Sequence, residues 1–145
     1  MAVKAGINMT ITYHSIKDIL QCLKQKGWYC NDNGKITYTR YCDNLILQRT
    51  QYKSYKMAVD FLMEQHKISP LQAIILIKEH TDIGITIFFT GNDALIISFS
   101  KNCRMKYYGK RNFVDLPWYI DEIIMPLALN FEIKSCECSQ IGGIF

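Results

Sequence analysis

Residues 83–100 read IGITIFFTGNDALIISFS, which is two apolar runs on either side of a turn. The runs are Ile83 to Phe89 and Ala94 to Ser100, and Thr90 to Asp93 between them are of the residue types that favour turns. Apolar side chains follow one another here without strict alternation, which is typical of strands covered on both faces. The sequence therefore predicts an antiparallel hairpin at the centre of a sheet.

A helix is predicted near the N-terminus. Ser15 and Asp18 resemble a capping box, in which side chains accept hydrogen bonds from free backbone amides at the start of a helix. The apolar residues that follow recur at helical spacing, and Gly27 is suited to the left-handed conformation that ends many helices. We expect this helix to end at about Lys26.

Three antiparallel strands are predicted next. The pair Asn33-Gly34 is the strongest short signal for a two-residue hairpin turn, and it predicts paired strands near residues 28–32 and 35–40. A third strand is expected at Leu45 to Thr50.

Two helices are predicted before the central hairpin. Ser54 to His66 shows helical spacing, with apolar residues on one face and charged residues on the other. Ser69 and Pro70 then match the cap and the first residue of another helix, which the apolar residues through Ile77 would continue. Because that run is apolar on most sides, we expect this helix to be buried.

A strand and a helix are predicted after the central hairpin. Cys103 to Tyr108 would extend the sheet by a basic strand. Asp115 or Leu116 would begin the last helix, and Pro126 should kink or break that helix near Glu122, because proline cannot donate the hydrogen bond to the carbonyl four residues earlier.

The predicted order is α-βββ-αα-βββ-α, in blocks rather than in alternating β-α-β units. Blocks of this kind favour an α+β fold, with an antiparallel sheet of hairpins and helices packed on it. No linker or low-complexity stretch divides residues 1–145, so we expect a single domain. The expected core residues are Ile19, Leu23, Phe61, Ile75, Phe88, Ile97, Ile124 and Leu127.

Composition excludes several classes of protein. Hydrophobic residues make up 49% and charged residues 21% of the 145 residues, as in globular domains. The apolar runs are far shorter than the about 18 residues of a membrane span, and residues 1–12 lack the apolar core of a secretory signal. We therefore expect a protein that stays in the cytoplasm and does not span a membrane. Its six cysteines should be mostly free thiols, because a chain of this length builds a core without disulfides.

No motif predicts a catalytic residue, a metal site or a cofactor. Cys136 and Cys138 could supply two metal ligands, with His80 or Cys103 completing the site, but free thiols or a disulfide near a frayed terminus is our interpretation. His14, His66 and His80 are expected just before one helix and at the ends of two others. Asp121, Glu132 and Lys134 have a nuclease-like spacing, but they fall on a predicted helix and its frayed end rather than on strands.

The most specific feature is a basic stretch at residues 101–111, with five cations and no acid. On a strand, Lys106 and Tyr108 would share one face with Arg104 and Lys110, and Tyr107 would lie on the other. Cations beside aromatic rings suit a nucleic-acid groove, and tyrosine and arginine also dominate protein interfaces. A third interpretation is an edge strand that lysine protects from aggregation.

A second basic segment, residues 35–56, is also rich in tyrosine. If the third strand lay near the sixth, the two segments would form one positive face. The candidate partner-binding residues are therefore Arg104, Lys106, Tyr107, Tyr108, Lys110, Arg111, Arg40, Arg49 and Tyr52.

The order of elements and the size resemble those of small bacterial partner-binding proteins, such as immunity proteins that neutralise toxins and chaperones of secreted effectors. The resemblance implies a non-enzymatic protein, and our first hypothesis is an immunity-type inhibitor that occludes the active site of a toxin or other partner. Effector chaperones tend to be acidic, whereas this chain carries a net charge of +4. The alternatives are a nucleic-acid-binding module that uses the basic face and an enzyme whose site is assembled from scattered residues.

Overall fold

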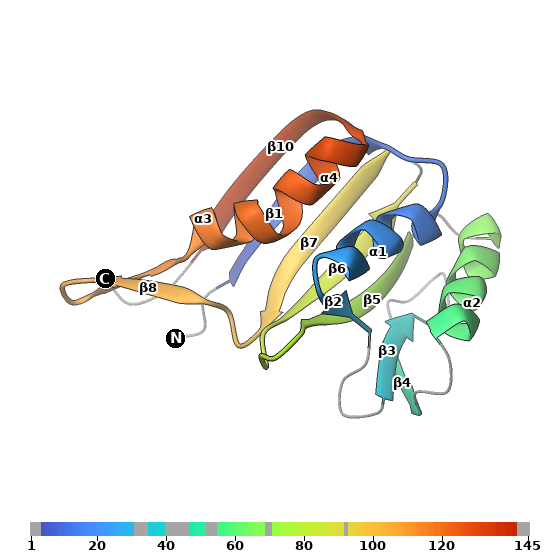
Figure 1. The fold of residues 1–145 in the computed structure, drawn as a ribbon, viewed down its shortest axis with the longest axis horizontal. Coiled ribbons are helices and arrows are strands. Elements are labelled where there is room, and N and C mark those ends of the chain that lie inside the picture. Colours follow the sequence, from blue (N-terminus) through green and yellow to red (C-terminus); the bar gives the residue numbers. More distant parts are fainter. Residues whose placement is uncertain are drawn as a thin grey trace.

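The computed structural model describes residues 4–30, 35–39, 47–51, 55–68, 71–91 and 93–141. They form an antiparallel sheet with helices packed on it, which confirms the predicted α+β class (Figure 1). The elements in chain order are β1 (Lys4–Thr12), α1 (Ile16–Gln25), β2 (Trp28–Tyr29), β3 (Lys35–Thr39), β4 (Leu47–Gln51), α2 (Tyr55–Ile68), β5 (Leu71–Lys78), β6 (Gly84–Thr90), β7 (Ala94–Lys101), β8 (Met105–Tyr108), β9 (Arg111–Val114), α3 (Leu116–Tyr119), the π-helix η1 (Ile120–Ile124), α4 (Met125–Asn130) and β10 (Glu132–Ile141).

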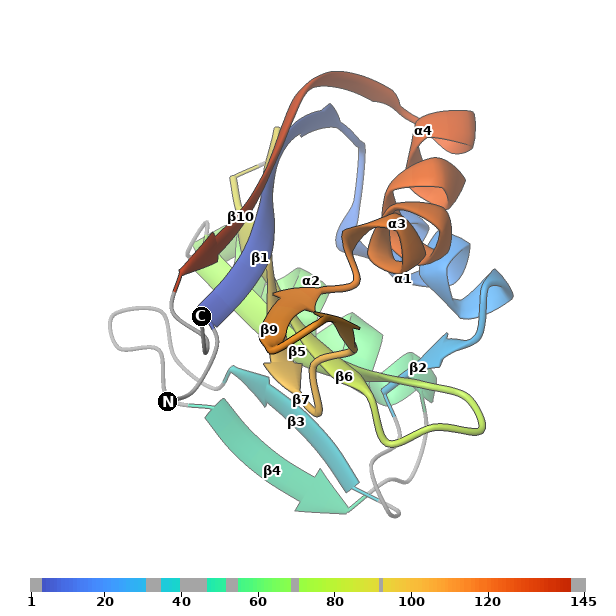
Figure 2. The ribbon, with the colours of Figure 1, turned by 90° about the vertical axis from the view of Figure 1, so that its left-hand side faces the viewer.

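The main sheet has the strand order β10-β1-β7-β6-β5-β3-β4, with β2 paired to β5 beside this path. The hairpin of β6 and β7 lies in the middle of that order, as residues 83–100 predict. Helices α1, α3 and α4 lie on one face of the curved sheet (Figure 2). None of the helices in the described ranges is long and apolar enough to cross a lipid bilayer.

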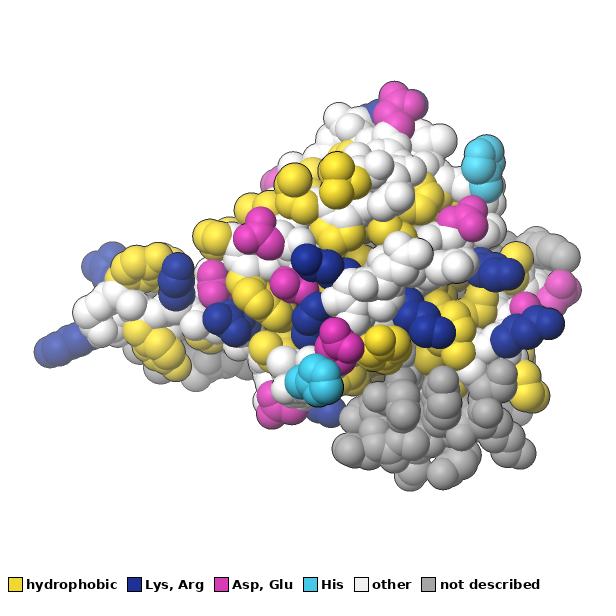
Figure 3. All heavy atoms as spheres, in the orientation of Figure 1, with side chains coloured by type: hydrophobic (Ala, Val, Ile, Leu, Met, Phe, Trp, Pro, Cys, Tyr) yellow, Lys and Arg dark blue, Asp and Glu magenta, His cyan; other side chains and the backbone are white. Residues whose placement is uncertain are grey.

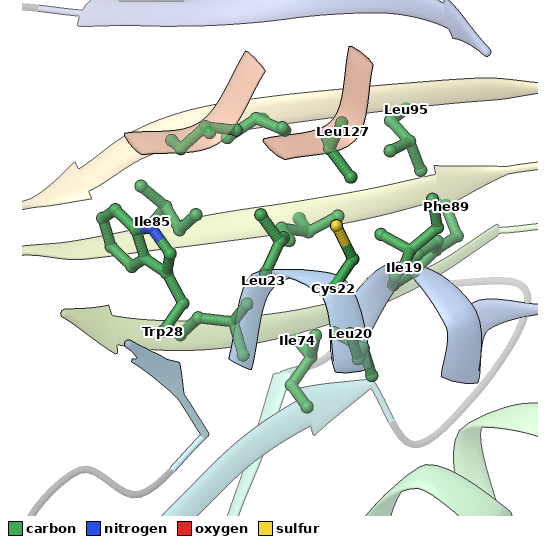
Figure 4. Packing of buried hydrophobic residues seen from close by; sticks show 14 of the residues in the cluster. Ile19, Leu20, Cys22, Leu23, Trp28, Ile74, Ile85, Phe89, Leu95 and Leu127 are labelled. Carbon is green, nitrogen blue, oxygen red and sulfur yellow. The ribbon is translucent and has the colours of Figure 1, made fainter. Parts of the chain in front are cut away.

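Helix α1 anchors the core against this face. The Ser15 hydroxyl accepts a hydrogen bond from the Asp18 amide at 3.4 Å, and Gly27 after the helix has φ +93°, so both predicted ends are confirmed. Ile19 and Leu23 on this helix are fully buried, and Figure 4 shows them directed at the strands together with Leu127 of α4.

Half of the predicted core residues are fully buried and half are partly buried. The fully buried set is Ile19, Leu23, Ile97 and Leu127, and the partly buried set is Phe61, Ile75, Phe88 and Ile124. Ile75 and Phe88 are the neighbours of Ile74 and Ile87, which are fully buried on the helix side. Because successive residues of a strand alternate between faces, Ile75 and Phe88 face away from the helices.

The predicted helix after Ser69 is wrong, because Leu71–Lys78 is strand β5, which pairs along its length with β6. A short, continuous apolar run fits a buried strand as well as a buried helix, and the isoleucines in it favour a strand. His80 consequently lies in the turn between β5 and β6, where its φ is +60°, and not at the end of a helix. Helix α2, in contrast, confirms the helix predicted for residues 54–66.

The predicted hairpin of residues 28–32 and 35–40 is also wrong. Trp28 in β2 pairs with Lys78, and Tyr38 in β3 pairs with Ile74, so within the described residues both strands pair antiparallel with β5 and not with each other. The expected turn at Asn33-Gly34 lies outside the described residues. Strand β4 pairs with β3, which confirms the third predicted strand.

Two strands at the ends of the chain are absent from the predicted order. Strand β1 pairs with β7 on one side and with β10 on the other. Its residues Ile7, Met9 and Ile11 are buried and alternate with polar residues, which is a readable strand pattern. The interpretation of residues 132–138 as a frayed end is therefore wrong, because they belong to β10.

The last helix is irregular where Pro126 predicts it to be. Residues 120–124 form a π-helical turn, in which the Met125 amide donates to the Ile120 carbonyl five residues earlier. Pro126 cannot donate to the Glu122 carbonyl, and this carbonyl accepts instead the indole N–H of the fully buried Trp28 at 3.1 Å. The side chain of Lys78 pairs with the Glu122 carboxylate and lies 5.8 Å from the centre of the Trp28 ring. The π-helical turn η1, strand β5 and strand β2 are thus joined at Trp28, Glu122 and Lys78.

We expect Trp28→Phe to lower the free energy of unfolding, because it keeps an aromatic ring but removes the donor to Glu122. A carbonyl that is shielded from water and loses its partner costs about 1–3 kcal/mol, and for the partly buried Glu122 carbonyl we expect the lower end of this range, in addition to the effect of the smaller ring. Urea denaturation followed by circular dichroism measures the loss. Trp118→Phe, at the neighbouring ring of the same cluster, is the control, and an equal loss in both variants would contradict the importance of the Glu122 bond.

Candidate binding surface

Strands β8 and β9 form a separate hairpin that projects from the body of the molecule (Figure 1). Tyr108 pairs with Arg111, which leaves Gly109 and Lys110 as a two-residue turn. Gly109 has φ +64° at the first central position, as a type II′ turn requires, and this turn matches the natural twist of a hairpin. We call residues 105–114 the arm.

The prediction that Cys103 to Tyr108 extends the main sheet is wrong. Within the described residues, β8 pairs only with β9. The chain turns away after β7 at Asn102, which has φ +48° and whose side-chain amide donates to the Asp82 carbonyl at 3.0 Å. The cations of β8 therefore do not protect an edge of the main sheet.

The arm exposes aromatic rings and cations together. Tyr107 is 70% exposed and Tyr108 is 61% exposed, and the Tyr108 and Phe113 rings meet edge to face at 5.8 Å. The side chains of Lys106, Lys110 and Arg111 are also exposed. No acidic residue occurs from residue 101 to residue 114. Figure 3 shows dark-blue and yellow side chains side by side over the projecting end.

The pairing register divides these side chains between the two faces of the arm. Lys106 lies opposite Phe113, and Tyr108 lies opposite Arg111, so these four share one face. Tyr107 lies opposite Asn112 on the other face. Both faces carry an exposed tyrosine, so a partner that surrounds the arm would contact both.

Arg104 holds the base of the arm. Its backbone amide donates to the Tyr119 hydroxyl at 2.9 Å, and its Nε donates to the Asp115 carboxylate at 3.0 Å. Its guanidinium carbon lies 5.1 Å from the centre of the Trp118 ring. Asp115 is buried, and its other oxygen accepts from the Trp118 amide at 3.4 Å as the cap of α3. These contacts make Arg104 a positioning residue of the arm.

A row of aromatic rings connects this base to the core. Tyr119 is fully buried and stacks on Phe99 at 3.8 Å, and it meets Trp118 edge to face at 4.9 Å. Trp118 in turn meets Trp28 edge to face at 6.0 Å. Burial raises the pKa of the Tyr119 phenol, so this hydroxyl stays protonated at neutral pH.

The second strand of the arm is also tied to the body. The Val114 amide donates to the side-chain carbonyl of Gln140 in β10 at 2.6 Å. The Asp115 amide donates to the Arg104 carbonyl at 2.9 Å, which closes the base across the two strands. Both strands of the arm are therefore fixed where they leave the molecule.

The second basic segment is only partly described. Arg40 and Tyr52 lie outside the described residues, and for Arg49 only the backbone pairing in β4 is described. In the described part of the chain β4 pairs with β3 and β8 with β9, so the two basic strands are not neighbours. They also lie well apart in Figure 1. The candidate surface is therefore the arm.

The other candidate residues lie elsewhere. Asp121 is on η1, and Glu132 and Lys134 are on β10. Across the described ranges, no group of three or more His, Cys, Asp or Glu side chains is placed to hold a metal ion.

A scan against protein-family models and searches of curated proteins and of solved structures found no match to this chain. The geometry and chemistry of the arm therefore carry the functional inference.

The sequence interpretation missed the second half of the arm. Phe113 is exposed and Asn112 is half-buried, but residues 111–114 were not predicted to form a strand. A readable signal was present, because Gly109 before Lys110 fits the first central position of a II′ turn between two short strands. The role of Arg104 had no such signal, since it depends on the approach of Tyr119 and Trp118 in space.

We expect Asp115→Ala to lower the free energy of unfolding by about 1–3 kcal/mol, because it removes a helix cap and the partner of Arg104 together. Asp121→Ala, at an exposed position on the same helical segment, is the matched control and should have little effect. Urea denaturation of both variants measures the difference. Equal midpoints would show that Asp115 does not fix the base of the arm.

Proposed function

We propose that this chain is a cytoplasmic, non-enzymatic binding protein that inserts its arm into an acidic cleft of a protein partner. The arm would then act as the inhibitory element of an immunity-type protein and occlude the active site of a toxin or another enzyme. The observation that carries the proposal is the exposure of Tyr107 and Tyr108 beside three cations on a projecting hairpin.

The exposed rings support binding to a protein. Tyrosine and arginine are enriched among the few residues that dominate protein interfaces. Burying a tyrosine removes a large apolar surface from water while its hydroxyl can still form a hydrogen bond. Tyr107 and Tyr108, on opposite faces of the arm, could both be buried if the arm enters a cleft.

The anchored base supports tight binding. A segment that orders only when it binds loses conformational entropy at that moment, whereas a fixed segment has already lost it. The bonds of Arg104 to Tyr119 and Asp115 and of Val114 to Gln140 hold both strands of the arm in place. The arm would therefore enter its partner without refolding.

The charge of the arm indicates the chemistry of the partner. With cations and no acid, the arm fits a cleft lined by carboxylates, because complementary potentials steer association and exclude wrong partners. Many hydrolases place paired carboxylates in such a cleft. Each strand has four residues, a reach of about 14 Å, which is enough to enter a cleft of this kind.

Nucleic acid is the second candidate partner. Two-stranded β-ribbons can enter the major groove, and the absence of acidic residues from 101 to 114 suits contact with phosphates. The affinity of this kind of binding falls steeply as salt is added, because binding releases counterions from the phosphates and their release is less favourable at high salt. It also varies little between unrelated sequences. That salt dependence distinguishes it from a protein partner held by a few aromatic anchors.

We expect Tyr107→Ser with Tyr108→Ser to abolish recovery of a protein partner, because the variant lacks both anchors. The measurement is co-purification from the native host with tagged wild type and variant, followed by mass spectrometry of the recovered proteins. Nuclease treatment of the lysate should not change the result. Recovery of nucleic acid with the wild type, lost on nuclease treatment, would favour the second candidate.

We expect reversal of the arm's charge, with Lys106, Lys110 and Arg111 replaced by Glu, to abolish recovery of the same partner. The matched control places Glu at Lys17, Lys56 and Lys134, which are exposed and lie off the arm, and makes the same change in net charge. Loss with both triple variants would show that net charge, and not the arm, determines binding. Circular dichroism of each variant checks that the fold is intact.

A further inference from the structure

Cys136 and Cys138 lie two residues apart on β10, at the edge of the main sheet. Residues at this spacing on a strand point to the same face. In the register with β1, Cys136 lies opposite Met9 and Cys138 lies opposite Ile7, so this is the face that carries the helices. The sequence interpretation placed the two thiols on a frayed end, but the pairing with β1 fixes their spacing.

The two thiols lie on the same face of β10 and are open to solvent. Cys136 is exposed and Cys138 is half-buried. Within the described residues no strand pairs with the outer edge of β10, so an ion can approach from that side.

A third sulfur atom lies on the adjacent strand. Met9 is buried, and the β-carbons of directly opposed residues such as Met9 and Cys136 are about 5 Å apart. The thioether of a methionine is a soft ligand, like a thiolate, although it carries no charge. Glu137, between the two cysteines, points to the opposite face and therefore adds no hard oxygen ligand.

We propose that Cys136 and Cys138 form a binding site for a soft monovalent metal ion, Cu(I), with the thioether of Met9 as a third donor. Each cysteine thiol gives its proton to solvent and forms one sulfur–copper bond, and no electron is transferred. Soft sulfur ligands select Cu(I) over hard ions that prefer oxygen. Structural Zn²⁺ is held by four protein ligands. The described part of the chain places no three His, Cys, Asp or Glu side chains together to hold a metal ion, so these residues suit Cu(I) better than Zn²⁺.

The test is a titration of the full chain, reduced and without oxygen, with Cu(I) held by the coloured chelator bathocuproine disulfonate. We expect wild type to withdraw one equivalent of Cu(I) from the chelator. Cys136→Ser and Cys138→Ser should each abolish the transfer, and Met9→Leu should weaken binding by about tenfold, as the loss of a supporting ligand does. Transfer of Cu(I) to a variant with serine at both Cys136 and Cys138, or no transfer to wild type, would overturn the proposal.

A further cysteine provides a control. Cys103→Ser changes a thiol that lies before β8, away from β10, and should still withdraw one equivalent. Equal urea midpoints of wild type and the two β10 serine variants would show that the loss of binding is not a loss of fold.

X-ray absorption at the copper edge should show only sulfur neighbours, and oxygen or nitrogen neighbours would contradict the assigned ligands. The same chain titrated with Zn²⁺ should bind it more weakly than Cu(I), and tighter Zn²⁺ binding would overturn the choice of metal.

Discussion

The hydrogen bond from the Trp28 indole to the Glu122 carbonyl determines how the last helical segment lies on the sheet. Pro126 removes the ordinary donor to this carbonyl, so a partly buried acceptor would otherwise lack a protein partner, at a cost of about 1–3 kcal/mol if it is shielded from water. Trp28 reaches it because Gly27 turns the chain after α1, with φ +93°, and accepts the Glu79 amide at 2.7 Å. These two bonds together tie the last helical segment to the end of α1 and to the end of strand β5.

The position of the arm follows from that constraint. Trp28 contacts Trp118, and Trp118 contacts both Tyr119 and the guanidinium of Arg104. Tyr119 then accepts the backbone amide of Arg104, where the arm begins. A contact path therefore runs from the core to an exposed surface, and it holds the tyrosines of the arm away from the body.

The local signals of the sequence predicted the elements that they control. Ser15 and Gly27 mark the ends of α1, residues 83–100 form the central hairpin, and Pro126 marks the irregular helix. The short apolar run of β5 fits a buried helix or a buried strand, its isoleucines favour the strand, and its pairing with β6 decides between them. The pairing of β1 with β10 joins distant ends of the chain, so no local pattern predicts it. The basic residues of the arm were found from charge and alternation, whereas the contacts of Arg104 exist only in three dimensions.

The central claim is that the arm is held rigidly on the body before it meets a partner. Backbone ¹⁵N relaxation of the free protein tests this directly, because order parameters report motion on the picosecond to nanosecond timescale. We expect values of about 0.85 for the strand residues of the arm, equal to those of the central hairpin β6–β7. Values below about 0.6 through residues 105–114, with a rigid main sheet, would contradict the claim.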